Sequence, residues 1–261
     1  MRIFLKATLI LLMIFLFIAV LILTRCLFIF SRKKRVLFVS YLLHIFNKIL
    51  VWILGIQVIV HKEENNLKAR GVFFVSNHYS YIDGIVAGSV FPFIFIGKTD
   101  LKNWPLLGIM IILSETVFVN RVNIFNIKKE IERVKFLLRN NVNTILFPEG
   151  TSSDGKNNIT FKSSFFAAPL QSECKIVPLT IEYKKVNNIK INDSNKDLVY
   201  WYGDMEFFPH FLGVLGLKRI EVELRVNTAL EINNTGDQNS SGKRKYLSQL
   251  TQSIIRYQQI Q

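Results

Sequence analysis

The sequence is short of the residues that build disulfide frameworks and metal centres. Its 261 residues include only two cysteines, Cys26 and Cys174, and four histidines. The cysteines have no spacing typical of a metal or redox motif, which argues against a disulfide-stabilised fold and indicates a reducing compartment. The Gly-x-Ser-x-Gly pattern of a serine nucleophile is also missing. We therefore do not expect a covalent enzyme nucleophile.

Acidic residues are scarce, with 19 Asp and Glu against 33 Lys and Arg, so the net charge is +14. This balance favours a polyanionic partner, such as an anionic membrane surface, a nucleotide-bearing cofactor or a nucleic acid. Nucleic acid is the weakest of these, because the basic residues are dispersed and no motif of that class is present. Half of the residues are apolar, which is enough for one sizeable core plus an appendage.

The amino-terminal region carries a long apolar run. Residues 7–24 contain no charge and would extend ~27 Å as a helix, close to the ~30 Å hydrocarbon thickness of a bilayer. A cleaved signal peptide is the alternative, but the run is long for one and has no small-residue cleavage site after it. We expect a membrane anchor whose basic cluster, Arg32 to Arg35, lies at the cytoplasmic surface. The rest of the chain would then face the cytoplasm, most simply from a bacterial inner membrane.

A second apolar segment, residues 36–60, is interrupted by a few polar side chains. This pattern favours a helix lying in the membrane interface or paired with the first helix, with an ordinary core helix as the alternative. We therefore divide the chain into an anchor of interfacial helices, residues 1–60, and a catalytic domain, residues 61–261.

Between residues 71 and 227, short β-rich runs alternate with helical ones. Apolar residues at a spacing of three and four predict a helix over residues 123–141. This alternation indicates an α/β fold with a mostly parallel central sheet flanked by helices. The polar residues 232–243 predict a loop, followed by a helix over residues 246–259. The runs read as strands are GVFFVSN, FPFIFIGK, ETVFVNR, NTILFPEG, KIVPLTIEY and RIEVELRVN.

The stretch NHYSYID places His78 five residues before Asp83. In a continuous helix the two side chains would lie about 140° apart and could not pair. If His78 lies in a loop and Asp83 in the first turn of the next helix, the loop can bring the ring back to the carboxylate. A histidine held in this way can act as a general base. The alternative is a loop histidine that only satisfies backbone groups.

A carboxylate, a glycine and a hydroxyl follow another strand end, as Glu149, Gly150 and Thr151 in the stretch FPEGT. In α/β folds ligands bind at the carboxyl ends of strands. Glu149 can bind a substrate hydroxyl or hold an arginine, and Gly150 lets backbone amides approach a ligand. Arg121 in FVNR follows a further strand end and is suited to phosphate. Each of these residues taken singly is also typical of a solvated surface.

With all these stretches in order, the sequence resembles the lysophospholipid acyltransferase family, which includes 1-acyl-sn-glycerol-3-phosphate acyltransferases. NHYSYID is similar to its first block, TVFVNR to the second, FPEGTSSDG to the third and IVPLTI to the fourth. The resemblance implies that His78 deprotonates the acceptor hydroxyl and Asp83 orients it. It also implies an acyl-CoA or acyl carrier protein donor, a lysophospholipid acceptor, no metal, and a glycerol phosphate held by Arg121, Glu149, Gly150 and Thr151.

The chain departs from the family pattern in one position of the third block. Many relatives have an arginine where this chain has Ser152, so part of the phosphate binding would come from elsewhere, with Lys98 and Lys162 as candidates. The stretches GTSSDG and WYGDMEFFPH resemble a bacterial subgroup, some of whose members acylate lyso-ornithine lipid. The acceptor head group therefore stays open.

Two classes of function remain at this point. The first is a membrane-bound acyltransferase that produces phosphatidate. The second is a non-enzymatic protein that binds acidic lipids through its basic residues, which explains the net charge but gives no reason for the histidine and aspartate pair.

Overall fold

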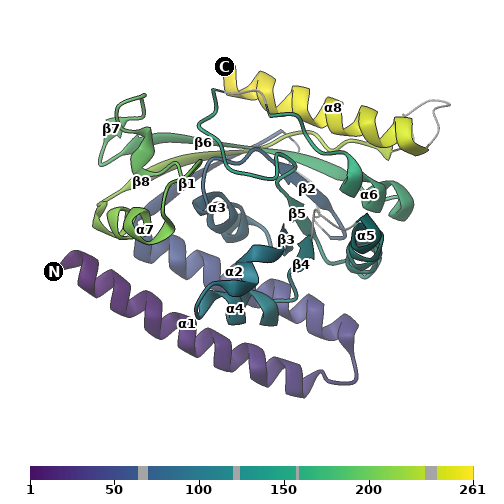
Figure 1. The fold of residues 1–261 in the computed structure, drawn as a ribbon, viewed down its shortest axis with the longest axis horizontal. Helices are drawn as coiled ribbons and strands as arrows, with labels where there is room; N and C mark the ends of the chain where they lie inside the picture. The colour runs from purple at the N-terminus through teal and green to yellow at the C-terminus, as the bar shows by residue number, and fades with distance from the viewer. Residues whose placement is uncertain (64–69, 120–123, 157–158, 233–239, 261) are drawn as a thin grey trace.

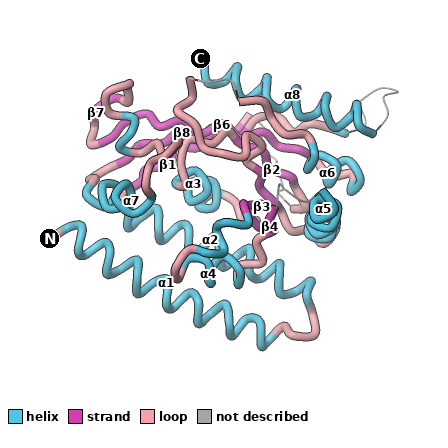
Figure 2. Tube along the Cα trace, in the orientation of Figure 1, coloured by secondary structure: helices cyan, strands magenta, loops and turns pink. Residues whose placement is uncertain are grey.

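The computed structural model describes residues 1–63, 70–119, 124–156, 159–232 and 240–260. Within these residues an eight-stranded sheet forms the centre of the molecule, and helices cover both of its faces (Figures 1 and 2). The strand order is β1-β8-β6-β2-β5-β3-β4, with β7 paired to β6. The strands are β1 (Ile56–Lys62), β2 (Phe73–Ser76), β3 (Ile94–Lys98), β4 (Val117–Val119), β5 (Thr144–Leu146), β6 (Ile176–Val186), β7 (Ile189–Lys190) and β8 (Ile220–Val226).

Five neighbouring strands, β6, β2, β5, β3 and β4, run in one direction. β8 pairs antiparallel with β6, and β1 pairs parallel with β8. The predicted α/β class with a mostly parallel sheet is therefore confirmed. Because parallel strands end on the same side of a sheet, the segments that follow β2, β5 and β3 emerge beside one another.

The two faces of the sheet carry different helices. α2 and α3 contact one face and α5, α6 and α8 lie on the other, while α1 packs outside α2 (Figure 1). Phe73, Phe74 and Val75 of β2 are completely buried, as expected for a strand covered on both sides. The α-helices are α1 (Arg2–Leu27), α2 (Arg32–Leu54), α3 (Ile82–Val90), α4 (Leu107–Leu113), α5 (Ile124–Arg139), α6 (Ala167–Ser172), α7 (Phe207–Gly216) and α8 (Ser240–Ile260), and the short 3₁₀ helices are η1 (Thr99–Asn103), η2 (Ser164–Phe166) and η3 (Lys196–Leu198).

The second predicted helix was extended too far. α2 ends at Leu54, and the residues that follow form strand β1 instead of continuing the helix to residue 60. Gly55 stops the helix because it takes a left-handed backbone conformation with φ +76°, and a Cβ there would lie 2.6 Å from the Lys218 carbonyl oxygen. The β-branched run after Gly55 then pairs with β8. The division proposed at residue 60 thus falls inside a strand of the central sheet.

The helix predicted over residues 123–141 is present as α5, and its apolar face is buried through Ile131, Val134 and Leu138. The carboxy-terminal helix is longer than predicted, because α8 begins at Ser240 within the expected loop. Serine is tolerated in the first helical turn, where backbone N–H groups still need partners, so its polarity misled the prediction.

α1 and α2 form a helical hairpin that lies along the α/β domain (Figure 1). Both helices are long and apolar enough to cross a bilayer by length and composition. α1 is fastened near both ends, because Lys6 Nζ donates to the carbonyl oxygens of Leu54 and Leu217 at 2.9 Å, and Arg25 pairs with Glu115 at 3.5 Å. The hairpin is therefore an integral layer of the fold.

Candidate active site

The histidine and aspartate of the first block meet at the carboxyl end of β2. α3 begins at Ile82, so His78 lies in the preceding loop and Asp83 in the first helical turn. The distance from His78 Nδ1 to Asp83 Oδ2 is 2.9 Å. The structure thus has the loop arrangement, in which the ring turns back to the carboxylate. The catalytic roles of the two residues remain predictions.

Asp83 is completely buried and is held by hydrogen bonds on both oxygens. Oδ2 accepts from the backbone N–H groups of Tyr79 at 2.6 Å and Ser80 at 2.8 Å, and Oδ1 accepts from the Tyr183 hydroxyl at 2.6 Å. Burial raises the pKa of Tyr183 well above its usual value, and the nearby Asp83 carboxylate raises it further, so the phenol keeps its proton and donates. These donors compensate the cost of burying the carboxylate.

The His78 ring is fixed on two sides. The ring stacks on Phe147 with centroids 4.4 Å apart and planes inclined by 26°. Because Asp83 only accepts, Nδ1 carries the hydrogen of that bond, and Nε2 is left as the acceptor of the neutral ring. The side chain keeps 21% of its surface exposed, so a substrate can reach it from solvent. Fixed orientation with an accepting Nε2 is the geometry of a general base.

The third block is joined directly to the first. Glu149 Oε1 accepts a hydrogen bond from the backbone N–H of His78 at 3.2 Å, and Oε2 accepts from the Ser153 hydroxyl at 3.3 Å. The backbone N–H of Ser153 in turn donates to the His78 carbonyl oxygen at 2.9 Å. His78 and Glu149 are 71 positions apart in sequence, and their two loops therefore form one unit.

Burial raises the pKa of the Glu149 carboxyl group to about 7 from its usual 4.5, against the opposing effect of the nearby His78. Only 9% of this residue is exposed. A carboxyl group that titrates near neutral pH in a site with a histidine is typical of functional sites. Here it can accept a hydrogen bond from a substrate hydroxyl when it is ionised and donate one when it is protonated.

Substitution Glu149→Gln is expected to stabilise the folded chain at neutral pH. Because the folded pKa is raised, ionising Glu149 costs the folded state stability as pH rises from 4.5 towards 7, by up to about 3 kcal/mol. The variant should match the wild type below pH 4.5 and be more stable above pH 7. Thermal unfolding across a pH series measures this difference, with exposed Glu173→Gln as the control. A constant difference at all pH values would contradict the raised pKa.

The remaining residues of the third block adopt a turn. Gly150 has φ +75°, a left-handed conformation that favours glycine, and its N–H donates to the Phe147 carbonyl oxygen at 3.0 Å. Thr151 is exposed beside it. The N–H of exposed Lys162 donates to the Pro148 carbonyl oxygen at 3.0 Å, which brings this predicted phosphate ligand beside the turn.

The other two predicted phosphate ligands lie further along the sheet. Lys98 ends β3 and is half-buried, and β3 is separated from β2 by β5. Neighbouring strands are about 4.8 Å apart, so Lys98 is about 10 Å along the sheet from the strand that leads to His78. Arg121 follows β4 but lies outside the described residues.

Several residues that build the site were not selected from the sequence. Tyr183, Phe147 and Ser153 hold Asp83, His78 and Glu149, and Asn77 makes two 2.9 Å hydrogen bonds with the backbone of Ile181. The motifs NHYSYID and FPEGTSSDG contain Asn77, Phe147 and Ser153, so the sequence did carry a signal for these three residues. Tyr183 is 100 residues from Asp83, and a single sequence carries no signal that joins these two residues.

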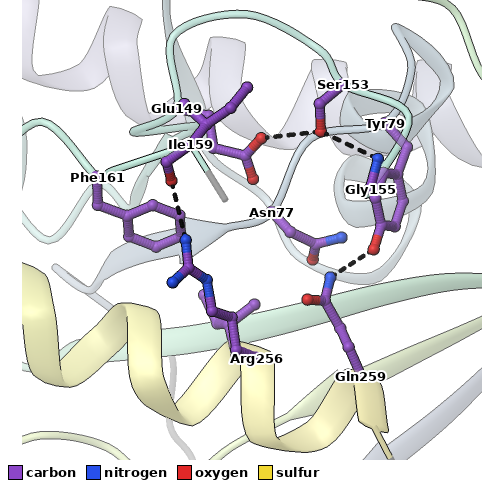
Figure 3. A pocket seen from close by; sticks show the side chains of 10 residues that line it. Asn77, Tyr79, Glu149, Ser153, Gly155, Ile159, Phe161, Arg256 and Gln259 are labelled. Atoms are coloured by element: carbon purple, nitrogen blue, oxygen red, sulfur yellow. Dashed lines mark hydrogen bonds between the residues drawn. The ribbon is translucent and has the colours of Figure 1, made fainter. Parts of the chain in front are cut away.

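A small cavity of about 40 Å³ borders Glu149 on the side that α8 covers (Figure 3). The volume suits a few water molecules and is too small for a lysolipid. His78 does not line it, so a large substrate has to approach His78 from elsewhere. The lining residues are Asn77, Tyr79, Glu149, Ser153, Gly155, Ile159, Phe161, Ile255, Arg256 and Gln259.

Comparison with known proteins agrees with this geometry. A family model described as Acyltransferase matches residues 57–182. The lyso-ornithine lipid O-acyltransferase of Rhizobium meliloti (strain 1021) is 31% identical over 211 residues, which are 78% of this chain and 70% of the relative. The chain belongs to this family of lysolipid acyltransferases. The matched segment includes the first and third blocks and most of the sheet, from β1 to β6.

Other relatives of this acyltransferase differ in the acceptor that they are named for. The lyso-ornithine lipid O-acyltransferase of Brucella abortus (strain 2308) is 32% identical over 59% of this chain and 60% of its own length. The 1-acyl-sn-glycerol-3-phosphate acyltransferase of Neisseria gonorrhoeae is 32% identical over 44% of this chain and 45% of its own length. The crystal structure of the LPA acyltransferase PlsC from Thermotoga maritima has the same fold, with a TM-score of 0.60 at 20% identity over 98% of both chains.

Proposed function

We propose that this acyltransferase moves an acyl chain from acyl-CoA or acyl carrier protein to the free hydroxyl of 1-acyl-glycerol-3-phosphate, giving phosphatidate. The observation that carries the proposal is the His78–Asp83 pair, 2.9 Å apart, whose loop is also bonded to Glu149. Activation of a hydroxyl requires a base in a fixed position, and Glu149 beside it can bind the acceptor. The donor thioester is already activated, so the proposal needs no cofactor or metal.

In the proposed reaction, His78 Nε2 removes the proton from the acceptor hydroxyl as its oxygen attacks the thioester carbonyl. The new C–O bond forms, the C–S bond breaks, and the proton on the imidazolium passes to the leaving thiolate. Asp83 stabilises the transient imidazolium, because its charge lies 2.9 Å from Nδ1. Glu149 orients the acceptor, and Lys98, Lys162 and Arg121 are the proposed cations for its phosphate.

The apolar outer surface of the molecule supports membrane association for this reaction. α1 exposes Phe15, Leu16 and Leu23 by 55–68% while its opposite side is buried on the domain. Ile109 of α4 and Phe208 of α7, two helices that α1 contacts, are also exposed, by 54% and 66%. We propose that α1 lies in one leaflet with these helices beside it, on the cytoplasmic face of the inner membrane. A two-chain product can then stay in the lipid phase.

Lyso-ornithine lipid is the second candidate acceptor. Ser152 stands where many relatives have an arginine. Its side chain is uncharged and the residue is only 8% exposed, so this position supplies no cation for a phosphate. The relatives from Rhizobium meliloti and Brucella abortus are both named for lyso-ornithine lipid. These observations support lyso-ornithine lipid as the alternative acceptor, because its head group carries no phosphate.

A direct acceptor screen tests the proposal. The purified chain with labelled acyl-CoA or acyl carrier protein is expected to convert lysophosphatidate to labelled phosphatidate, with the acceptor hydroxyl at His78 and its phosphate at the proposed cations. Lyso-ornithine lipid is measured in parallel, and each acceptor is compared with an analogue that lacks the free hydroxyl. Product from lyso-ornithine lipid alone would transfer the assignment to the second candidate. If none of the lysolipids is acylated with either donor, the proposed enzyme function is contradicted.

A further inference from the structure

A wide groove lies where the turn between α1 and α2 meets α5 at the edge of the sheet beside β4. Its volume is about 820 Å³, and His78, Asp83 and Glu149 do not line it. We call it the basic groove, because six of its lining residues are basic and two are acidic, a net charge of +4. The lining residues are Arg25, Cys26, Ile29, Arg32, Arg35, Lys102, Glu115, Lys129, Glu130 and Arg133.

The two acidic residues of the basic groove are already neutralised. Glu115 is 7% exposed and pairs with Arg35 at 2.8 Å and with Arg25 at 3.5 Å. Glu130 pairs with Arg133 at 3.0 Å, one turn along α5. The ion pairs of Glu115 join both helices of the hairpin to the segment that leads into β4, and so fix the shape of the groove.

The other three cations remain available for a ligand. Across the part of the chain that the structure describes, no carboxylate pairs with Arg32, Lys102 or Lys129. The Arg32 guanidinium lies 4.5 Å from the ring centroid of Phe136, and the Lys102 ammonium lies 4.4 Å from that of Phe118. These rings hold the charges in place, so less conformational entropy is lost when an anion binds.

The turn between α1 and α2 places exposed apolar side chains beside the basic groove. Ile29 lines it and is 64% exposed, and its neighbours Leu27 and Phe30 are 67% and 100% exposed. These residues continue the exposed apolar side of α1. A ligand that fits both features has an anionic head group and a hydrocarbon part.

We propose that the basic groove binds the phosphate head group of an anionic membrane phospholipid, whose acyl chains lie against Leu27, Ile29 and Phe30. Acyl-CoA also has phosphates and a hydrocarbon chain, but its chain lies beyond the thioester that has to reach His78, and His78 does not line the groove. The inference rests on the membrane placement proposed above and is independent of which lysolipid is acylated. It also gives a function to the basic cluster Arg32 to Arg35, because Arg32 and Arg35 line the groove.

Neutralising the groove should weaken binding of an anionic phospholipid selectively. The double variant Arg32→Gln, Lys129→Gln avoids the ion pairs of Glu115 and Glu130, so it should fold. Lys33→Gln, Lys34→Gln is the matched control, because these exposed lysines follow Arg32 in α2 but do not line the groove. Native mass spectrometry of the full chain in a non-ionic detergent measures retention of dioleoyl phosphatidylglycerol, with dioleoyl phosphatidylcholine for comparison.

The wild type is expected to retain one phosphatidylglycerol in preference to phosphatidylcholine. The groove variant should bind it about thirtyfold more weakly, because each of the two cations lost near a lipid phosphate costs about fivefold in affinity, and the control should stay within about threefold. Equal losses in both variants would overturn the proposal in favour of general electrostatics. Displacement of the lipid by coenzyme A would overturn it in favour of a donor site. Acyl transfer by His78 in a detergent assay is measured alongside, so failure of the enzymatic proposal is seen separately.

Discussion

Replacing His78 by alanine is expected to lower acyl transfer about 10³-fold, because the acceptor hydroxyl loses the group that removes its proton. The fold should tolerate the change. Asp83 keeps its bonds from Tyr79, Ser80 and Tyr183, and the loss of one hydrogen bond costs about 1 kcal/mol. Initial rates with labelled donor and lysolipid measure the effect, together with thermal unfolding and membrane partition.

His61→Ala is the matched control for this experiment. His61 is half-exposed on β1 at the far edge of the sheet, so its removal should leave the rate unchanged. Added imidazole should restore part of the activity of His78→Ala, because the vacated position can admit a free base. Full activity without His78 would remove the proposed base and with it the mechanism.

Replacing Asp83 by alanine should inactivate the protein and also destabilise it by about 4 kcal/mol. The change leaves the N–H groups of Tyr79 and Ser80 and the hydroxyl of Tyr183 without acceptors in a buried place, at about 1–3 kcal/mol each. Thermal or denaturant unfolding measures the stability, and acyl transfer is assayed on the folded fraction.

Asp83→Asn separates the two effects. Its amide oxygen can still accept from Tyr79 and Ser80, so most of the stability should remain, while loss of the charge beside His78 should lower activity by about 10²–10³-fold. Asp193→Ala, an exposed carboxylate paired with Lys156 at 3.0 Å, is the control and should change neither property. A stable and fully active Asp83→Asn would contradict the role given to the carboxylate charge.

The predicted elements were most accurate where one local pattern decided the outcome. Alternating apolar strands and the amphipathic helix α5 gave the mostly parallel sheet, because each must bury an apolar side. Strand β1 was missed for a specific reason. Its apolar residues continue those of α2, and only the left-handed Gly55 and pairing with β8 end the helix.

The site could be predicted only in part. His78 and Asp83 are five residues apart, and a loop before a helix start is a local arrangement that can be reasoned from spacing. The partners that hold them come from distant segments: the Tyr183 hydroxyl of β6 donates to Asp83, and the Ser153 N–H after β5 donates to the His78 carbonyl oxygen. The basic groove was also not foreseen, because its charges come from α1, α2, η1 and α5. Arg121 lies outside the described residues, so its role stays a prediction.

By itself the sequence determined the class of fold and the family, and it predicted His78 as the base, since these depend on apolar periodicity and on short motifs whose residues are neighbours along the chain. The tertiary structure decided the rest. Burial of the Glu149 carboxyl group, the donors around Asp83 and the assembly of the basic groove all depend on which distant segments come into contact. A single chain does not encode those contacts in any local pattern, because they follow from the packing of the whole core.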